Sequence, residues 1–390
     1  MFLAPPADTP SVARPLAPDG PAVRGFVAPR AQFPPSAPAP TMLQIFSRQS
    51  GAAVAAPAPA PAPAAAPAAP PAGALPELPS DASVEALLTD MLRQRVARLE
   101  HELATARDTG DAPALLAGLA TGGASEVRQP PAAAQRALTV CRNPDCSQRE
   151  VVRLLEGNPT LTHALLKSAN SVHYSSGGAP CVSLGAAVQR VGIRGVYNVV
   201  LESTMEGMLC RPGAGYDALV EQVWSHMVRT APVTRTLARA FDVGPDEAFA
   251  LGLLHDIGKL VLFDRVSGMR NELRRNLVVP APLLSRMLGE LHEPLGGLAV
   301  LKWGLGATAG LAVSAHHRTV RVAHPTPDRL SESIYLAERV DIAQFHKRPM
   351  ALEEWWTAGA LTGSRARAEE LLAAAVAAAA AEGPPARGRR

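Results

Sequence analysis

Apolar residues recur at every third or fourth position through most of the chain after residue 80, and this spacing most constrains the fold. Polar or glycine-containing breaks interrupt it, and no segment shows the period-two alternation of a strand. The sequence therefore predicts one all-α, multi-helix domain with a single core over residues 130–350. Its predicted helices are 147–156, 159–171, 183–191, 194–209, 215–241, 245–264, 268–275, 280–303, 307–318 and 328–346.

Residues 1–80 differ from this domain in composition. The 390-residue chain has 37 prolines, most of them in its first third, and Ala-Pro alternation is densest around residues 56–72. Such a segment buries too little apolar surface to offset its ordering entropy. We predict that residues 1–80 are a long disordered Pro/Ala-rich region. A short apolar island at 41–48 is either a docking peptide or an incidental cluster.

Residues 81–108 carry an amphipathic helical pattern that runs through Leu103, with Ser80 or Asp81 as the N-cap. A single helix with one apolar face needs a partner. That partner is either the main domain or a second copy in a short coiled coil, so a homodimer through 81–108 is one expectation. Residues 351–390 are predicted to form an Ala-rich helix followed by a basic disordered tail.

Charge and targeting signals exclude several classes of protein. The formal net charge is only +3, which makes nucleic-acid binding improbable outside the Arg-rich C-terminus. The four cysteines have no Cys-x-x-Cys spacing and are expected to be reduced thiols. No secretory signal follows Met1, and no stretch has the roughly 18 strongly apolar residues of a membrane span. We therefore expect a cytoplasmic protein without membrane contact.

The doublet His255–Asp256, in the run Leu-Leu-His-Asp-Ile-Gly-Lys, is the strongest candidate for chemistry. An imidazole and a carboxylate together hold a divalent ion when further ligands arrive from other elements. The small Gly258 that follows allows close approach by another helix or a ligand. The doublet therefore predicts a metal site if other ligands are available.

Further candidate ligands lie on other predicted helices, as expected for a metal site inside a helix bundle. They are His226, His292, the pair His316–His317, and Asp341. A single histidine on a helix is usually a satisfied core or surface group, but several together favour a metal site. Adjacent helical residues diverge by about 100°, so at most one member of His316–His317 is expected to face the same ion.

The order His226, His255–Asp256, Asp341 resembles the ligand pattern of the HD superfamily. The segments 165–174 (Leu-Leu-Lys-Ser-Ala-Asn-Ser-Val-His-Tyr) and 182–192 are more specifically similar to the HDOD family. That family is a signalling-output relative of the HD-GYP cyclic-di-GMP phosphodiesterases. The resemblance covers about residues 130–350 and extends through segments 250–258, 292–296, 303–305 and 316–317. It implies an all-α HD/HDOD fold and a metal site.

The segment after His317 departs from the HD-GYP enzymes. Where they have Asp-Gly-x-Gly-Tyr-Pro, this chain has Arg-Thr-Val-Arg-Val-Ala-His-Pro at 318–325. HDOD proteins are generally regarded as regulatory modules without an established activity. The resemblance thus implies a signal-transduction output module. Its site would be retained as a structural metal centre or as a pocket that senses a small ligand such as a nucleotide, while the helices around Asn170 and Ser171 engage a signalling protein. A structural cap is the more common role of those two residues.

The alternative is a metal-dependent phosphohydrolase or phosphodiesterase acting on a nucleotide or cyclic nucleotide. One or two divalent ions would activate water, and Lys259 would contact a phosphate oxygen. Fe, Mn, Mg and Zn are not distinguishable from the sequence. A weaker third option is DNA association through the Arg-rich tail. The pair Trp355–Trp356 is expected to cover an apolar patch or to form an interface.

Overall fold

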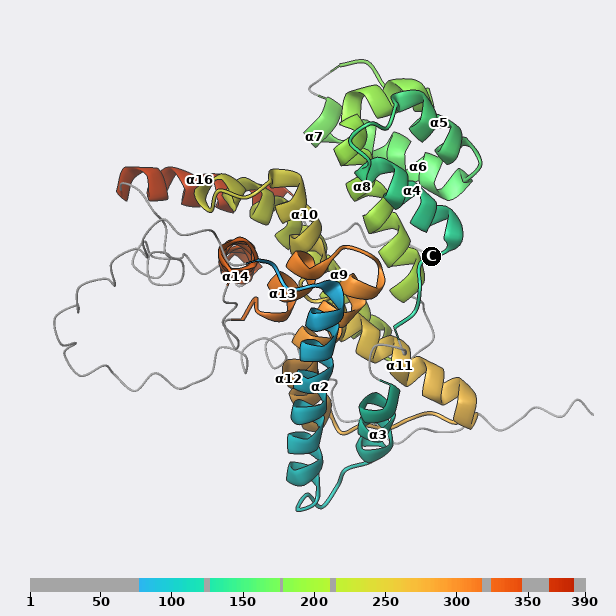
Figure 1. Ribbon diagram of the computed structural model, residues 1–390, viewed down its shortest axis with the longest axis vertical. Helices are drawn as coiled ribbons and strands as arrows, with labels where there is room; N and C mark the ends of the chain where they lie inside the picture. The colour runs from blue at the N-terminus through green and yellow to red at the C-terminus, as the bar shows by residue number, and fades with distance from the viewer. Residues whose placement is uncertain are drawn as a thin grey trace, which may run out of the picture. The chain divides into compact units, whose positions relative to one another are not determined.

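A computed structural model describes residues 77–122, 127–175, 178–210, 215–317, 324–345 and 365–381. These residues are overwhelmingly helical and contain no strand, which confirms the all-α prediction (Figure 1). Four predictions fall outside the described residues: disorder over 1–76, the island at 41–48, the Trp355–Trp356 pair and the basic tail after residue 381.

The helices have the following bounds. They are α2 (Asp81–Leu103), α3 (Ala112–Gly122), α4 (Ala132–Arg142), α5 (Gln148–Glu156), α6 (Pro159–Ala169), α7 (Val172–Ser175), α8 (Leu184–Leu209), α9 (Asp217–Leu237), the 3-10 helix η2 (Ala238–Ala240), α10 (Pro245–Leu254), α11 (Ile257–Leu273), α12 (Ala281–Lys302), α13 (Ala307–Ser314), α14 (Pro325–Phe345) and α16 (Arg365–Ala381). None of the described helices is long and apolar enough to cross a membrane.

Several helices begin at side chains that cap them. The side-chain oxygens of Ser80, Ser147, Asn158 and Ser183 accept backbone N–H groups in the first turns of α2, α5, α6 and α8. Asn170 ends α6, and its Nδ2 donates to the carbonyl of Cys181 at 2.9 Å, while its Oδ1 accepts the Cys181 N–H at 2.6 Å. The structure therefore gives Asn170 a structural role at the end of α6.

The observed helices differ from the predicted ones at particular glycines and small residues. The two helices predicted at 183–191 and 194–209 form one element, α8, with a break at Gly192, whose φ of 76° is in the left-handed region. Helices α3 and α4 were not predicted. The buried face of α4 consists of Ala134, Ala137, Leu138 and Cys141, so only one large apolar side chain marks it.

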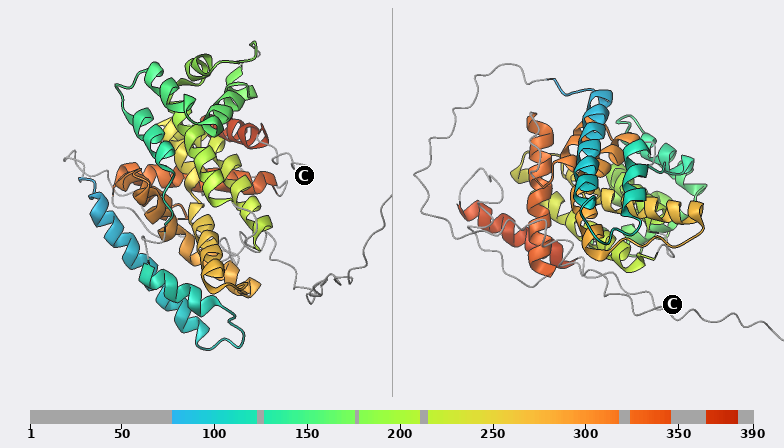
Figure 2. Two further views of the ribbon diagram at one scale, coloured as in Figure 1. Left: turned by 90° about the vertical axis from the view of Figure 1, so that its right-hand side faces the viewer. Right: turned by 90° about the horizontal axis from the view of Figure 1, so that it is seen from below.

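Helix α12 lies against α2, α11 and α13 (Figures 1 and 2). A Cβ added to Gly258 of α11 would lie 1.9 Å from the carbonyl oxygen of His292 and 2.7 Å from the nitrogen of Gly296. One added to Gly297 would meet Leu88 of α2 at 2.7 Å and the carbonyl of Gly310 of α13 at 2.8 Å. The sequence predicted that another helix or a ligand would lie close to Gly258. In the structure it is helix α12, whose backbone contacts that of α11 at this glycine.

Helix α2 packs its apolar face on the main domain. Its buried residues are Val84, Leu88, Leu92, Val96, Leu99 and Leu103, and its neighbours are α3, α12 and α13. Of the two partners considered for this helix, the structure shows the main domain, and a homodimer through 81–108 stays a prediction. A second apolar cluster, which includes Leu237, Leu336 and Ala375, joins α9, α14 and α16.

Candidate metal centre

His255 and Asp256 occupy a two-residue break between α10 and α11, where the sequence predicted one continuous helix. Both are fully buried. His255 Nδ1 lies 2.8 Å from the carbonyl oxygen of Gly252, and because a carbonyl only accepts, this nitrogen donates. Burial is the main reason that the pKa of His255 is lowered to about 3, so the ring is neutral at pH 7 and its Nε2 carries a lone pair.

A first ligand group consists of Asp256, His292, His316 and His317, whose candidate ligand atoms lie within 4.8 Å of one another. His292 Nδ1 donates to the carbonyl of Leu288 at 2.8 Å, and His316 Nδ1 to that of Val313 at 2.6 Å. Their other ring nitrogens therefore face inward. This is the usual arrangement of metal-binding histidines, in which an acceptor orients each ring.

The inward atoms of this first group have no hydrogen-bond partner. Asp256 Oδ1 and the Nε2 atoms of His292, His316 and His317 are all buried and unpaired. Each such atom costs about 1–3 kcal/mol, so four converging ones are expected only where a further species binds them. The donor set of three imidazoles and a carboxylate fits a divalent transition-metal ion.

A second ligand group consists of His226, His255 and Glu338, again within 4.8 Å of one another. His226 Nδ1 lies 2.7 Å from Asp341 Oδ2, and its Nε2 lies 3.2 Å from His255 Nε2. At this distance the two nitrogens can share one proton in a hydrogen bond, and without that proton they can bind one cation together. Two imidazole nitrogens on a tetrahedral ion are roughly 3.3 Å apart, which agrees with the observed spacing.

Asp256 connects the two ligand groups. Its Oδ1 lies 3.7 Å from His292 Nε2 and 3.8 Å from His316 Nε2, while its Oδ2 lies 3.6 Å from His255 Nε2 and 3.9 Å from His226 Nε2. One carboxylate oxygen thus faces each group. The arrangement suits a bridging ligand between two ions.

Lys259 is fully buried, and its Nζ donates to Asp256 Oδ2 at 2.6 Å. Burial raises the pKa of Asp256, but the ammonium of Lys259 and the neighbouring His255 outweigh it and hold this pKa well below the usual range. Lys259 therefore contacts the bridging carboxylate.

The cluster attracts positive charge. Burial, and then the charge of Asp256, raise the pKa of Glu338. Burial lowers the pKa of His316, but the carboxylates of Asp256, Glu293 and Glu338 outweigh it and raise this pKa above its usual value. At 3.8 Å the attraction between His316 and Asp256 is electrostatic rather than a hydrogen bond. A cation bound here would relieve the same excess of negative charge.

The structure brings together six of the seven predicted ligands, namely His226, His255, Asp256, His292, His316 and His317. The expectation that only one of His316 and His317 faces the first group is wrong. Helix α13 ends at Ser314, so the pair lies in a turn where the helical 100° step does not apply, and the two rings are 4.0 Å apart.

Asp341 has a different place from the one predicted. Its Oδ1 accepts from Arg229 Nε at 2.9 Å, and its Oδ2 accepts from Arg229 Nη2 at 3.0 Å as well as from His226. It therefore orients His226 and belongs to neither ligand group. Glu338, one turn earlier on α14, is in the second group and was missed, although a carboxylate at i−3 on the same face was a usable signal.

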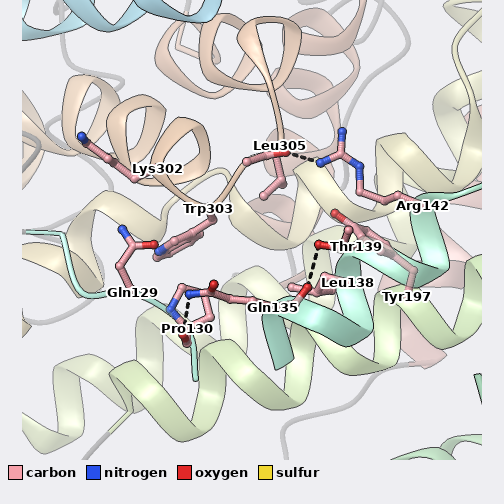
Figure 3. A pocket seen from close by; sticks show the side chains of 11 residues that line it. Gln129, Pro130, Gln135, Leu138, Thr139, Arg142, Tyr197, Lys302, Trp303 and Leu305 are labelled. Carbon is pink, nitrogen blue, oxygen red and sulfur yellow. Dashed lines mark hydrogen bonds between the residues drawn. The ribbon is translucent and has the colours of Figure 1, made fainter. Parts of the chain in front are cut away.

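A cavity of about 250 Å³, whose lining Figure 3 shows, has none of the candidate ligand residues in its walls. It is lined by Gln129, Pro130, Gln135, Leu138, Thr139, Arg142, Tyr197, Lys302, Trp303, Gly304 and Leu305. Several polar groups in it already have protein partners, such as Trp303 Nε1, which donates to the carbonyl of Arg128 at 2.9 Å. The cavity contains no candidate metal ligand.

Comparison with known proteins places this geometry in a family context. Residues 127–319 match the sequence profile of the HDOD domain. An uncharacterized protein of Treponema pallidum (strain Nichols) is 27% identical over 191 residues, which are 47% of this chain but only 35% of that protein. The chain thus spans about a third of the length of this relative.

Two solved structures have a similar fold. The "Putative phosphohydrolase" from Shewanella amazonensis SB2B is 20% identical, with a TM-score of 0.52 over 69% of this chain and 98% of that one. An HDOD domain protein with unknown function from Geobacter sulfurreducens is 17% identical, with a TM-score of 0.50 over 74% of this chain and 97% of that one. At these identities the likeness shows the fold alone.

Proposed function

Because residues 127–319 form an HDOD domain, we propose that the protein is a regulatory module of signal transduction with a retained two-ion metal centre. It acts by binding a signalling protein or a small ligand such as a nucleotide. The observation that carries this proposal is a nearly complete set of oriented ligands that is closed to solvent.

Burial of the ligands favours a regulatory or structural metal centre over a hydrolytic one. His226, His255, Asp256, His292, His316 and Glu338 are each at most 2% exposed. His317 is the most accessible ligand, with 13% of its side chain exposed. A hydrolytic centre needs an open coordination position and room for its substrate beside the ions.

The ligand set also favours particular metals. Five imidazoles suit Fe, Mn or Zn better than Mg, which prefers oxygen ligands and retained waters. When bound, such an ion lowers the pKa of coordinated water and polarises phosphoryl oxygens. The residues of this chain hold it: Asp341 orients His226, and main-chain carbonyls orient His255, His292 and His316.

The second candidate is a metal-dependent phosphohydrolase acting on a nucleotide or cyclic nucleotide. Lys259 favours it, since a buried ammonium beside the bridging carboxylate is well placed for a phosphate group. In the described structure Lys259 is bound to Asp256, so it would have to turn from that carboxylate to contact a substrate.

The test combines metal analysis with activity. The full chain and its His255→Ala/Asp256→Ala variant are purified, their metal content is measured by mass spectrometry, and both are assayed on bis(p-nitrophenyl) phosphate, nucleotides and cyclic dinucleotides. We expect bound metal in the parent, none in the variant, and no turnover in either. If the parent hydrolyses one of these substrates and the variant does not, the proposed regulatory function is wrong and the phosphohydrolase is supported. If the parent contains no metal after incubation with Mn²⁺, Fe²⁺ or Zn²⁺, neither candidate function can depend on a metal centre.

A signalling partner, a nucleotide ligand, a cytoplasmic location and a homodimer through residues 81–108 complete the proposal. The dimer would use the outer face of α2, where Leu87 is 47% exposed, because the inner face is buried on the main domain. Sedimentation equilibrium of the full chain and of a Leu87→Glu variant tests it. A monomer at all concentrations would contradict the dimer.

A further inference from the structure

Helix α2 lies outside the segment that matches the HDOD domain, yet one of its side chains contacts Glu293, the residue that follows the candidate ligand His292. Arg95 Nη1 donates to the carbonyl of Glu290 at 2.7 Å and to Glu293 Oε2 at 3.0 Å, both on α12. Only 11% of the Arg95 side chain and 1% of the Glu293 side chain are exposed. This ion pair is therefore nearly desolvated, unlike most pairs on a protein surface.

The other oxygen of Glu293 binds the turn that carries two ligands. Glu293 Oε1 accepts the backbone N–H of His317 at 3.2 Å. The turn is also fixed by His316 Nδ1, which donates to Val313, and by His317 Nδ1, which lies 3.3 Å from Glu338 Oε2. Glu293 thus joins α2 on one side to the backbone of the first ligand group on the other.

Because the Glu293 side chain is a buried carboxylate, its ion pair with Arg95 stabilises it. A buried carboxylate without a counter-charge is unfavourable by several kcal/mol. One oxygen of Glu293 already accepts the backbone N–H of the candidate ligand His317, so a Glu293 side chain released by Arg95 would stay beside the first ligand group. The guanidinium of Arg95 offers it a charge-assisted bond on the side away from the ligands.

We propose that Arg95 is a positioning residue for the metal centre, which acts through Glu293 to hold the turn that carries His316 and His317. The proposal rests on the proposed two-ion centre. It assigns to α2 a role beyond packing, since a movement of this helix would change the metal-binding geometry.

The test compares four variants of the full chain by Co²⁺ binding. Co²⁺ affinity is measured by competition with a chelating dye, and the visible d–d absorption of bound Co²⁺ reports on coordination geometry. Arg95→Met is expected to lower the affinity about tenfold and to change the absorption spectrum, as loss of an orienting partner does at other metal sites. The matched control is Arg98→Met, one turn later on α2, which loses an exposed pair with Glu290 at 3.4 Å and should stay within about twofold of the parent.

Glu293→Gln separates positioning from packing. Its amide oxygen still accepts the His317 N–H but carries no charge, so this variant should bind Co²⁺ within about threefold of the parent. The double variant Arg95→Met/Glu293→Gln should resemble Glu293→Gln, because the released anion is absent. Thermal unfolding in EDTA checks that each variant is folded, and the neutral double variant provides the test should Arg95→Met not fold.

Two results would overturn the inference. One is an Arg95→Met protein with the affinity and spectrum of Arg98→Met. The other is a tenfold loss in the double variant, which would mean that Arg95 does not act through Glu293. If the parent binds no Co²⁺, the proposed metal centre itself fails. A parent that binds Co²⁺, with an Arg95→Met variant that binds it equally, contradicts this inference alone.

Discussion

His255 and His292 are fully buried and His317 is largely buried, and all three are neutral bases in the candidate metal centre. Burial is the largest cause in each case, and it lowers all three pKa values. A neutral imidazole is the form that binds a metal ion, so these residues are ready to bind at pH 7. In acid, however, burial of these neutral bases lowers the free energy of unfolding of the metal-free protein.

We predict that the free energy of unfolding of the metal-free protein falls as the pH drops below about 6.5. Each of the three bases has a lower pKa folded than unfolded, so the unfolded chain binds more protons there. The loss is at most about 1.4 kcal/mol per pH unit for each histidine, and it continues for His255 until its folded pKa of about 3.

Two groups with raised pKa values modify this loss. Glu338 takes up a proton in the folded chain at a higher pH than in the unfolded chain, which offsets part of the loss above the usual pKa of a glutamate. His316 also holds its proton more firmly in the folded chain, so it offsets part of the loss until the unfolded chain is also protonated there, well below pH 6.5. Urea unfolding at pH 7, 6 and 5 measures the slope, and a constant free energy of unfolding would contradict the prediction.

Glu338 and Asp341 are predicted to respond differently to substitution. Glu338→Ala removes a ligand of the second group and should weaken binding of one ion by more than about tenfold. Asp341→Asn keeps an oxygen that accepts from His226 Nδ1, so its loss should be smaller than that of Glu338→Ala. Titration calorimetry with Zn²⁺ compares the two, and a larger loss for Asp341→Asn would reverse their assignment.

The sequence identified the histidines of the candidate site. It did not show that Glu338 lies in a ligand group whereas Asp341 orients His226. Glu338 and Asp341 are three residues apart and lie on one face of α14. Which of them reaches the ligand groups depends on the axial position of α14 against α9, and that is set by tertiary packing. The same limit applies to Glu293, whose role follows from its distance to α2.

At the scale of helices, close packing around α12 positions the ligands. Gly258 and Gly296 bring α11 against α12, which places Asp256 beside His292. Gly297 allows α2 and α13 to close on the same helix. These contacts leave no room for an additional methyl group at Gly258.

Gly258→Ala is therefore predicted to destabilise the protein by about 3 kcal/mol, because its Cβ would overlap backbone atoms of α12 that cannot move independently. The matched control is Gly207→Ala in α8, where nothing lies within 4 Å of the added Cβ. That change should be neutral or stabilising by up to about 1 kcal/mol. Urea unfolding of both variants decides, and equal stabilities would show that α11 and α12 are not in backbone contact.

Most helices could be predicted from the sequence by their recurring apolar residues, and some, such as α5 and α6, also by a capping residue. The exceptions have physical reasons. Helix α4 buries a single large apolar side chain, Leu138, among alanines and a cysteine, and neither residue of the break at His255–Asp256 is a glycine or proline. The break places His255 in the second candidate ligand group and Asp256 in the first.

At the scale of the whole chain, the matched HDOD segment does not contain all of the metal centre or its support. It ends at residue 319, whereas Glu338 and Asp341 lie on α14 and Arg95 lies on α2. Helix α14 thus supplies one member of the second ligand group, Glu338, and α2 contacts Glu293 beside the ligand His292. The periodicity of the sequence predicted both flanking helices. Their contacts with the candidate site could be seen only in the three-dimensional structure.

The central claim is that Asp256 joins two metal sites in one buried centre. Native mass spectrometry of the full chain, purified without chelator and saturated with Zn²⁺ or Mn²⁺, counts the bound ions directly. We predict two ions for the parent and none retained by Asp256→Ala, because the shared carboxylate serves both ligand groups. A parent with no specific ion, or an Asp256→Ala variant that still binds two, would contradict the account.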